Sequence, residues 1–331
     1  MNNVYLLDSN RKGPSFLLYR EMLGLMGIPT VSIDSLSKVG KDDSIIYMGY
    51  DCNTRLDLER KSIAKRYICL DPRKTFKHQP PRTDWVIANG LENEISYRSP
   101  ERKVTCISIY QLVSEEYKNR GADEAGDTGK IVFGYHGNHI HIQSLSKLIR
   151  GAIQDVGIRE GASFHLCVNA KGMRTASRLA KETETVKVIE WSEENCKRVI
   201  AESHVGLCHG TILESGYAAA IFRSIEGVSR RCHASDYKVR YKSCANPGRI
   251  VSFQQLGKPT LADLYASAIT EIGATDGGLL YHNNESFIYC LKRMIENGEE
   301  RRRQGANARA NFRRKHSIEV MRRRLEAWID A

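Results

Sequence analysis

Short apolar runs separated by polar turns dominate the first third of the chain. Runs rich in Val, Ile, Leu and aromatic residues predict strands, and they lie at 4–7, 30–33, 45–48, 67–70, 85–88 and 104–110. The stretch 14–26 begins with proline, has apolar residues at helical spacing and stops at Gly27. Strands that alternate with helices in this way predict a parallel sheet covered by helices.

The same alternation restarts after residue 130. It predicts strands at 131–135, 163–168, 186–189, 204–208 and 259–263, and helices at 142–152, 175–181 and 193–202. Residues 119–130, NRGADEAGDTGK, contain no apolar side chain larger than Ala and form the predicted linker. A chain of 331 residues is long enough for two domains. We place them at 1–118 and 131–305, followed by a basic amphipathic helix at 306–331.

The segment 242–262, KSCANPGRIVSFQQLGKPTLA, predicts a capped helix that leads directly into a buried strand. Asn246 suits the N-cap and Pro247 the first helical position. Free backbone N–H groups at such a helix start, with Arg249 in the first turn and Lys242 just before it, would hold a phosphate. A phosphorylated ligand is therefore the first expectation.

Composition excludes several protein classes. The apolar runs are much shorter than the roughly 18 residues that a membrane-spanning helix needs, and MNNVYLLDSN lacks the pattern of a secretory signal. Nine cysteines are scattered without a CxxC pair. That scatter indicates reduced thiols rather than disulfides or a zinc site. We expect a cytoplasmic protein.

The net charge of +11 is concentrated near the C-terminus. Residues 301–324 hold ten Lys or Arg and one acid, so the rest of the chain is nearly neutral. This distribution argues against a broad groove for nucleic acid, although a basic helix could meet an anionic membrane or RNA. An apolar stripe at helical spacing would dock the same helix: Ile318, Met321, Leu325 and Trp328.

Several segments of the second half occur in the order found in the donor-binding domain of GT-B glycosyltransferases. They are IVFGYHGNHIHIQSL (131–145), VIEWSEENCKRVIAESHVGLCHG (188–210), YKSCANPGRIVSFQQLGKPTLAD (241–263), DGGLLYHNNESFIYCLKRMIEN (276–297) and RRRQGANARANFRRKHS (301–317). Over 130–320 the chain resembles the family 4-like retaining enzymes of this fold, while the first half agrees only in general architecture.

The resemblance implies an α/β protein with two Rossmann-like doubly wound domains facing a cleft, and a C-terminal helix that crosses back onto the first domain. It implies a glycosyltransferase that moves a sugar from a nucleotide diphosphate sugar, UDP- or GDP-linked, to an acceptor hydroxyl. The acceptor would be a glycan, a lipid-linked sugar or a small molecule. Neither a cofactor nor a metal ion is expected.

One motif departs from the resemblance. Enzymes of this kind usually carry two glutamates around the helix of segment 241–263, one near the transferred sugar and one near the ribose. Counting back from Gly257 places Cys244 and Ser252 at those positions. Three other functions therefore stay open. They are a non-hydrolysing sugar-nucleotide epimerase, a catalytically inactive nucleotide-sugar-binding subunit, and an RNA-binding protein that uses the basic tail.

Donor-binding candidates follow the predicted strands of the second half. Gly137 would let the backbone approach a pyrophosphate, and the resemblance places Glu190 and Trp191 beside the nucleobase. The full set is His136, Gly137, Asn138, Lys171, Glu190, Trp191, His209, Lys242, Asn246 and Arg249. Plainer roles also fit these residues: an ordinary turn at Gly137, a surface position for Lys171 in the loop 170–172, and a core position for Trp191.

Three candidates lie in the first half. Gly13 would let its loop approach a phosphate or an acceptor, or it simply forms a turn. Asp71 would act as acid or base on an acceptor hydroxyl, although a turn or a helix cap also suits it. His78 is the second catalytic candidate. We expect no metal site, because His139 and His141 point in different directions in either a strand or a helix.

Overall fold

The computed structural model describes residues 4–7, 14–28, 30–33, 36–48, 64–71, 83–98, 100, 103–113, 117, 129–210 and 246–329. The chain divides into two compact units. The first contains the residues up to Ile109 and the C-terminal stretch Lys315–Ala331, and the second contains Tyr110–Ala218 and Pro247–Arg314. Within the described residues, no helix combines the length and the apolar character needed to cross a bilayer.

Parallel strands form the sheet of the first unit. They are β1 (Val4–Leu7), β2 (Thr30–Ile33), β3 (Ser44–Met48), β4 (Arg66–Leu70), β5 (Trp85–Ala88) and β6 (Lys103–Cys106). Their order across the sheet is β2-β1-β3-β4-β5-β6, with parallel pairing throughout. The predicted strands are present, except that the last one ends at Cys106 instead of at residue 110.

Alternation along the strands gives this sheet two buried faces. One face carries the buried cluster around Ile45, Tyr47 and Cys69. Helices α1 (Pro14–Leu25) and α15 (Ile318–Ile329) place Leu23 and Leu325 beside residues of the other face. The short elements η1 (Leu36–Lys38) and α3 (Leu91–Tyr97) complete the described part of the unit.

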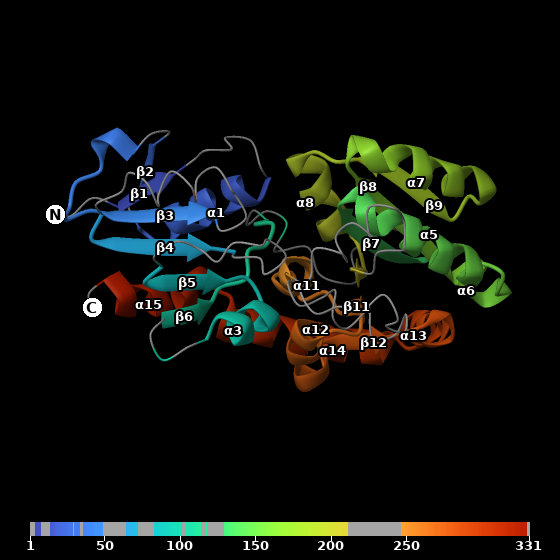
Figure 1. Ribbon diagram of the computed structural model, residues 1–331. Helices are drawn as coiled ribbons and strands as arrows, with labels where there is room; N and C mark the ends of the chain where they lie inside the picture. Colours follow the sequence, from blue (N-terminus) through green and yellow to red (C-terminus); the bar gives the residue numbers. More distant parts are fainter. Residues whose placement is uncertain are drawn as a thin grey trace, which may run out of the picture. The chain divides into compact units, whose positions relative to one another are not determined.

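A second parallel sheet organises the other unit (Figure 1). Its strands are β7 (Ile131–Gly137), β8 (Ala162–Val168), β9 (Val186–Glu190), β10 (Val205–Cys208), β11 (Thr260–Asp263) and β12 (Gly278–Tyr281), in the order β12-β11-β10-β7-β8-β9. Phe133 on β7 stacks on Phe164 of β8 with ring centroids 5.6 Å apart, at the centre of the buried core. The strands predicted from apolar runs are all present.

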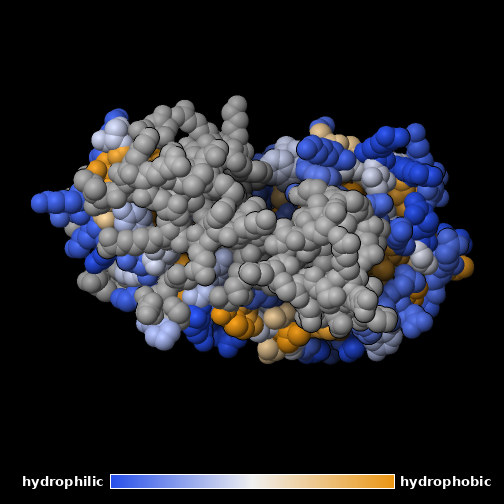
Figure 2. Space-filling view, viewed as in Figure 1, coloured by the Kyte–Doolittle hydropathy of each residue, from blue (hydrophilic) through white to orange (hydrophobic). Residues whose placement is uncertain are grey.

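Helices surround this sheet. They are α5 (His139–Ala152), α6 (Val156–Gly161), α7 (Ala170–Glu182), α8 (Glu193–Glu202), α11 (Gly248–Gln254), α12 (Ala266–Glu271), α13 (Asn284–Glu296) and α14 (Gly298–Lys315), with the short turn η3 (Gly273–Thr275). Figure 2 shows mostly hydrophilic residues on the outer surface around α6 and α7, as expected of helices that bury only one face.

Side-chain caps start two helices earlier than the apolar pattern predicts. Asn138 caps α5 and Asn169 caps α7, each through its side-chain oxygen. Residues 139–141 and 170–174 are therefore helical instead of belonging to loops. The prediction that Lys171 lies in a loop is wrong, because that residue occupies the first turn of α7.

Segment 242–262 forms a shorter helix than predicted. α11 begins at Gly248 with Pro247 as its N-cap, so Asn246 lies outside the helix and is not its cap. Every residue of α11 except Arg249 is buried. Gly206 on β10 has no room for a Cβ, which would lie 2.4 Å from the ring of Phe253. The helix is therefore pressed against β10, and Gly257 ends the segment with a positive φ of 68°, as expected.

The basic C-terminal stretch is two helices instead of one. α14 ends at Lys315 and α15 begins at Ile318. The Ser317 side chain accepts a hydrogen bond from the N–H of Val320 and so caps the start of the new helix. On α15 the predicted stripe buries Met321 and Leu325, whereas the side chain of Trp328 lies outside the described residues. Arg324 Nη1 donates to the carbonyl of Cys106 at 3.2 Å. α15 thus returns to the first unit, as predicted.

Candidate functional site

The second sheet has a topological switch point between β7 and β10. From β7 the chain proceeds through β8 to β9 on one side of the sheet, then returns to place β10 on the other side of β7. The carboxyl ends of β7 and β10 carry 136–138 and 209–210. Ligands of doubly wound sheets bind at this kind of crevice, so the edge is the candidate functional site.

Gly137 ends β7 at a point where a larger residue does not fit. A Cβ there would lie 2.7 Å from Tyr135 Oη and 3.2 Å from Arg249 Nη1. Asn138 follows at once, and its side chain accepts from the N–H of Ile140 at 3.4 Å. The strand therefore enters α5 through a tight turn, so the positive end of the helix dipole lies at this edge.

Arg249 holds a positive charge at the same edge. Its Nη1 donates to the carbonyl of His209 at 2.6 Å, and its guanidinium lies 5.6 Å from the ring centroid of Tyr135. Burial lowers the pKa of Arg249, but the nearby Tyr135, Tyr265, Cys208 and Asp263 outweigh it and raise that pKa above its ordinary value. The residue as a whole is half-buried, and its guanidinium is permanently charged.

His136 is a neutral imidazole with an uncommitted nitrogen. Burial, followed by the charge of Arg249, lowers the pKa of His136 to about 3. The ring packs beside Phe253 at a centroid distance of 5.7 Å. Among the described residues, Nε2 has no hydrogen-bond partner. This nitrogen is buried at the carboxyl end of β7, and its hydrogen-bonding capacity is not used by the described residues.

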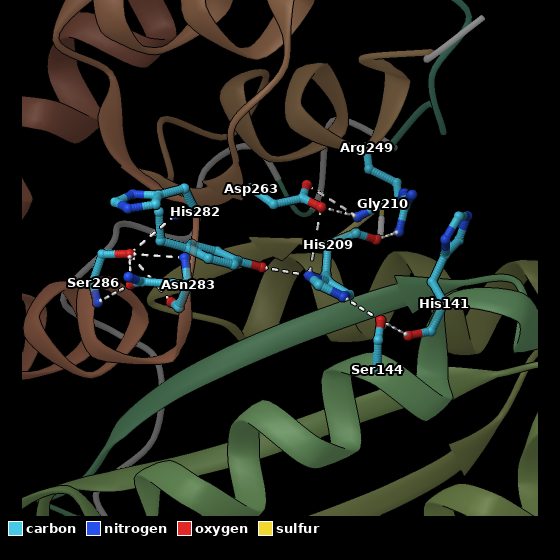
Figure 3. Close-up of polar contacts among 10 residues, drawn as sticks. His141, Ser144, His209, Gly210, Arg249, Asp263, His282, Asn283 and Ser286 are labelled. Atoms are coloured by element: carbon cyan, nitrogen blue, oxygen red, sulfur yellow. Dashed lines mark hydrogen bonds and ion pairs between the residues drawn. The ribbon is translucent and has the colours of Figure 1, made fainter. Parts of the chain in front are cut away.

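His209 is buried in a network that joins several elements (Figure 3). Its Nδ1 lies 2.7 Å from Tyr281 Oη on β12, and its Nε2 lies 2.5 Å from Ser144 Oγ on α5. Because Ser144 donates to the carbonyl of His141, Nε2 carries the imidazole proton and Nδ1 accepts from Tyr281. The His209 side chain is thus committed to this network, and it is the His209 carbonyl that contacts Arg249.

Asp263, at the end of β11, adds a carboxylate to the network. It accepts from the N–H of Gly210 at 3.1 and 3.2 Å and lies 3.7 Å from His209 Nδ1. Burial first, and then the charge of Asp263, raises the pKa of Tyr281 well above its ordinary value, so the phenol keeps its proton. The network fixes the end of β10, and with it the carbonyl that orients Arg249.

The remaining donor candidates of the second unit lie farther along the sheet. Lys171 is exposed on α7, and Glu190 is exposed at the end of β9. Trp191 follows it with 37% of its surface exposed, and the backbone N–H of Trp191 donates to the Val168 carbonyl at 2.8 Å. Because Trp191 is exposed instead of filling the core, its ring is accessible to a flat ligand.

Asp71 is buried in a turn of the first unit. Its side chain is 1% exposed, its φ is 47°, and Asn93 Nδ2 donates to its Oδ1 at 3.4 Å. These features favour the turn role over the role of acid or base. Three other candidates, Gly13, His78 and Lys242, lie outside the described residues.

Sequence reasoning missed the residues that hold the site together. Tyr135, Ser144, Asp263 and Tyr281 belong to it. A usable signal existed for the last two, because each is a polar residue that closes an apolar strand, TLAD and GLLY. In the described part of the chain, no group of three His, Cys, Asp or Glu side chains is arranged to hold a metal ion.

Solved structures with this architecture come from several organisms. HepE from Anabaena, solved in complex with UDP and glucose, has 14% identity and a TM-score of 0.65, with 100% of both chains covered. Sucrose-phosphate synthase from Thermosynechococcus elongatus has 9% identity and a TM-score of 0.65, covering 100% of this chain and 98% of that one. TarM has 12% identity and a TM-score of 0.58, covering 89% of this chain and 56% of that one.

No family model matches the sequence, and no curated protein matches it. At the identities above, likeness establishes the fold and leaves the function to be argued from the site. The fold is GT-B, with two Rossmann-like α/β domains that each contain a parallel sheet.

Proposed function

We propose that the chain binds a nucleotide diphosphate sugar at the carboxyl edge of its second sheet and transfers the sugar to an acceptor hydroxyl. One observation carries the proposal: Arg249, the tight turn at Gly137 and the amino end of α5 meet at the switch point. They offer a fixed positive charge and backbone donors to a diphosphate. The bound UDP and glucose of HepE support the proposal by analogy.

In the transfer, the bond between the anomeric carbon and the diphosphate breaks, and the diphosphate leaves with the electron pair. Arg249 and the α5 amino end would stabilise that developing negative charge. The acceptor oxygen forms the new bond to the anomeric carbon, and its proton passes to the departing diphosphate. His136, held neutral, would hydrogen-bond the bound donor through Nε2 instead of adding a second charge.

The finer details belong to the same proposal. The donor is UDP- or GDP-linked, the acceptor is a sugar or a lipid-linked sugar, and neither cofactor nor metal takes part. The protein works in the cytoplasm and meets the anionic inner face of the membrane through α15. Exposure of Arg322 and Arg323 on that helix supports the last point.

A second candidate is a subunit that binds the nucleotide sugar without transferring it. Ser252 stands where the resembling enzymes carry an acid. It is fully buried, donates to the Gly248 carbonyl at 2.8 Å and accepts from the N–H of Gln111 at 2.9 Å. Serine has no carboxylate, and the Ser252 hydroxyl is already hydrogen-bonded to backbone groups of its own unit. It therefore does not replace the missing acid beside a bound sugar.

The test is a panel of UDP- and GDP-linked sugars, scored first by thermal shift and then by release of nucleoside diphosphate with and without candidate acceptors. We expect the sugars linked to one of the two nucleotides to raise the melting temperature of the protein at millimolar concentration. We also expect release of nucleoside diphosphate to depend on an acceptor. Interconversion of the sugar without an acceptor would favour an epimerase, and stabilisation without release would favour the binding subunit. If no nucleotide sugar stabilises the protein, the donor site itself is refuted.

A further inference from the structure

The first unit contains a partly enclosed cavity of about 210 Å³. It lies against the amino ends of the strands, the edge opposite the carboxyl ends where doubly wound sheets bind their ligands. Its lining residues from the sheet are Val4, Ser44, Ile46, Arg66, Ile68, Trp85 and Ile87. Lys65 precedes β4, and the cavity is closed by Leu23 of α1, Leu325 of α15 and Ile28, which follows α1.

The sheet residues of the lining share one face. Val4 pairs with Ser44 and Ser44 with Arg66 in the parallel register, while Ile68 pairs with both Ile46 and Trp85. Alternation puts the opposite residues, such as Ile45 and Tyr47, into the core on the other side. The cavity is therefore a gap between this face and the two covering helices, and its wall is mainly apolar.

The size of the cavity limits what it can hold. An apolar cavity of about 150 Å³ accommodates benzene, and pockets for drug-sized ligands begin at about 300 Å³. A cavity of about 210 Å³ lies between these sizes. It suits a medium-length hydrocarbon chain or a small aromatic ring system.

Two cationic side chains, Lys65 and Arg66, line the cavity, and a third, Lys103, lies beside the lining residue Trp85. Lys65 and Lys103 are exposed, and Lys103 Nζ and the Arg66 guanidinium each lie 5.4 Å from the ring centroid of Trp85. Two carboxylates of the same edge accept from backbone amides: Asp43 from Gly40 at 2.7 Å, and Asp84 from Tyr67 at 2.8 Å. These carboxylates keep their charge. Among the described residues at the starts of β3 to β6, four basic groups (Lys41, Lys65, Arg66 and Lys103) face three acidic ones (Asp42, Asp43 and Asp84), so the net charge of this edge is about +1.

We propose that this cavity binds an amphipathic anion, with an apolar body inside and a carboxylate or phosphate head outside, near Lys65 and Lys103. Apolar burial supplies affinity and the lysines select the charge of the head. Two sources share this chemistry: a free short-chain or aromatic carboxylate, and the acyl chain of an anionic lipid. The site belongs to the first unit alone and does not depend on the donor site.

The first experiment compares octanoate, octanol and octylammonium, which have the same chain and different heads. Binding is followed by Trp85 fluorescence, with Trp85→Phe to identify that signal among the three tryptophans, and by calorimetry. We expect octanoate to bind about tenfold tighter than octanol, with octylammonium weakest. Equal affinity for octanoate and octanol would overturn the role of the lysines.

Variants then locate the site. Lys65→Gln with Lys103→Gln should weaken octanoate about five- to tenfold and leave octanol unchanged. The matched control, Lys181→Gln with Lys187→Gln, removes two exposed lysines of the second unit and should change neither ligand. Leu325→Phe and, independently, Ser44→Leu should weaken both ligands by filling the cavity or its mouth. If folded forms of both variants bind octanoate normally, the cavity is not the site.

Sedimentation with vesicles distinguishes the two sources when Arg322 and Arg323 of α15 are first replaced by glutamine, so that this helix does not itself hold the vesicle. Binding to phosphatidylglycerol vesicles, but not to phosphatidylcholine vesicles, that is lost in the Lys65 and Lys103 variant and in Ser44→Leu would identify a lipid chain. Octanoate binding without vesicle binding would identify a soluble anion. Absence of binding in both experiments would refute the proposal.

Discussion

His136 is an ordinary histidine in the sequence and an unusual one in the fold. Its pKa depends on burial and on Arg249, a residue that folding brings close from far along the chain. A local pattern predicted the position of the neighbouring Gly137 in a turn, because a turn between a strand and a helix favours glycine. The pattern did not reveal the second reason for Gly137, which is the space that Tyr135 and Arg249 occupy.

Replacing His136 should change how stability depends on pH. The folded-state pKa of about 3 lies below the ordinary 6.5, so between these values the unfolded chain binds the additional proton. The stabilisation is therefore complete above about pH 6.5 and decreases as pH falls toward about 3, by up to about 1.4 kcal/mol per pH unit. His165, with a pKa lowered to about 4 by burial and Lys187, acts in the same direction.

Urea unfolding at a series of pH values measures this effect. His136→Phe should reduce the slope of the unfolding free energy against pH between about pH 6 and pH 4 by about one proton. The control Gln143→Ala, at an exposed position of α5 that carries no titratable group, should retain the wild-type slope. An unchanged slope in His136→Phe would show that the imidazole is not buried in its neutral form.

At the scale of elements, apolar runs identified strands better than helices. A run such as IIYM in β3 is buried from end to end, so its pattern is unambiguous. Helix starts depend on single side-chain caps, such as Asn138 and Asn169, that lie outside the apolar stripe. The break between α14 and α15 was missed for the same reason, since only the Ser317 cap marks it.

The docking of α15 yields a prediction at this scale. Met321 is fully buried on the first unit, so Met321→Ala should lower the free energy of unfolding by about 2–5 kcal/mol. The exposed neighbour Arg323 provides the control, and Arg323→Ala should leave stability within experimental error. Chemical denaturation of both variants measures the difference. Equal stability of Met321→Ala and wild type would mean that α15 does not dock through this stripe.

For the whole molecule, alternation of strands and helices predicted two parallel sheets, and the order of segments predicted the GT-B fold. The candidate site was only half predictable. Residues in the β7 turn and Arg249 stand in recognisable motifs, but the network of Ser144, His209 and Tyr281 exists only because the sheet order brings β10, β12 and α5 together. Such contacts between distant segments leave no local pattern.

The central claim is that Arg249 holds a diphosphate, and calorimetry with a nucleoside, its monophosphate and its diphosphate tests it most directly. The nucleobase of these ligands is the one whose nucleotide sugar stabilises the protein best in the thermal-shift panel. The control variant is Arg302→Ala, which removes an exposed arginine of α14. Arg249→Ala should weaken diphosphate binding about 10- to 100-fold, consistent with loss of a charged hydrogen bond, and leave nucleoside binding within about twofold. Equal losses for nucleoside and diphosphate in Arg249→Ala would contradict the claim.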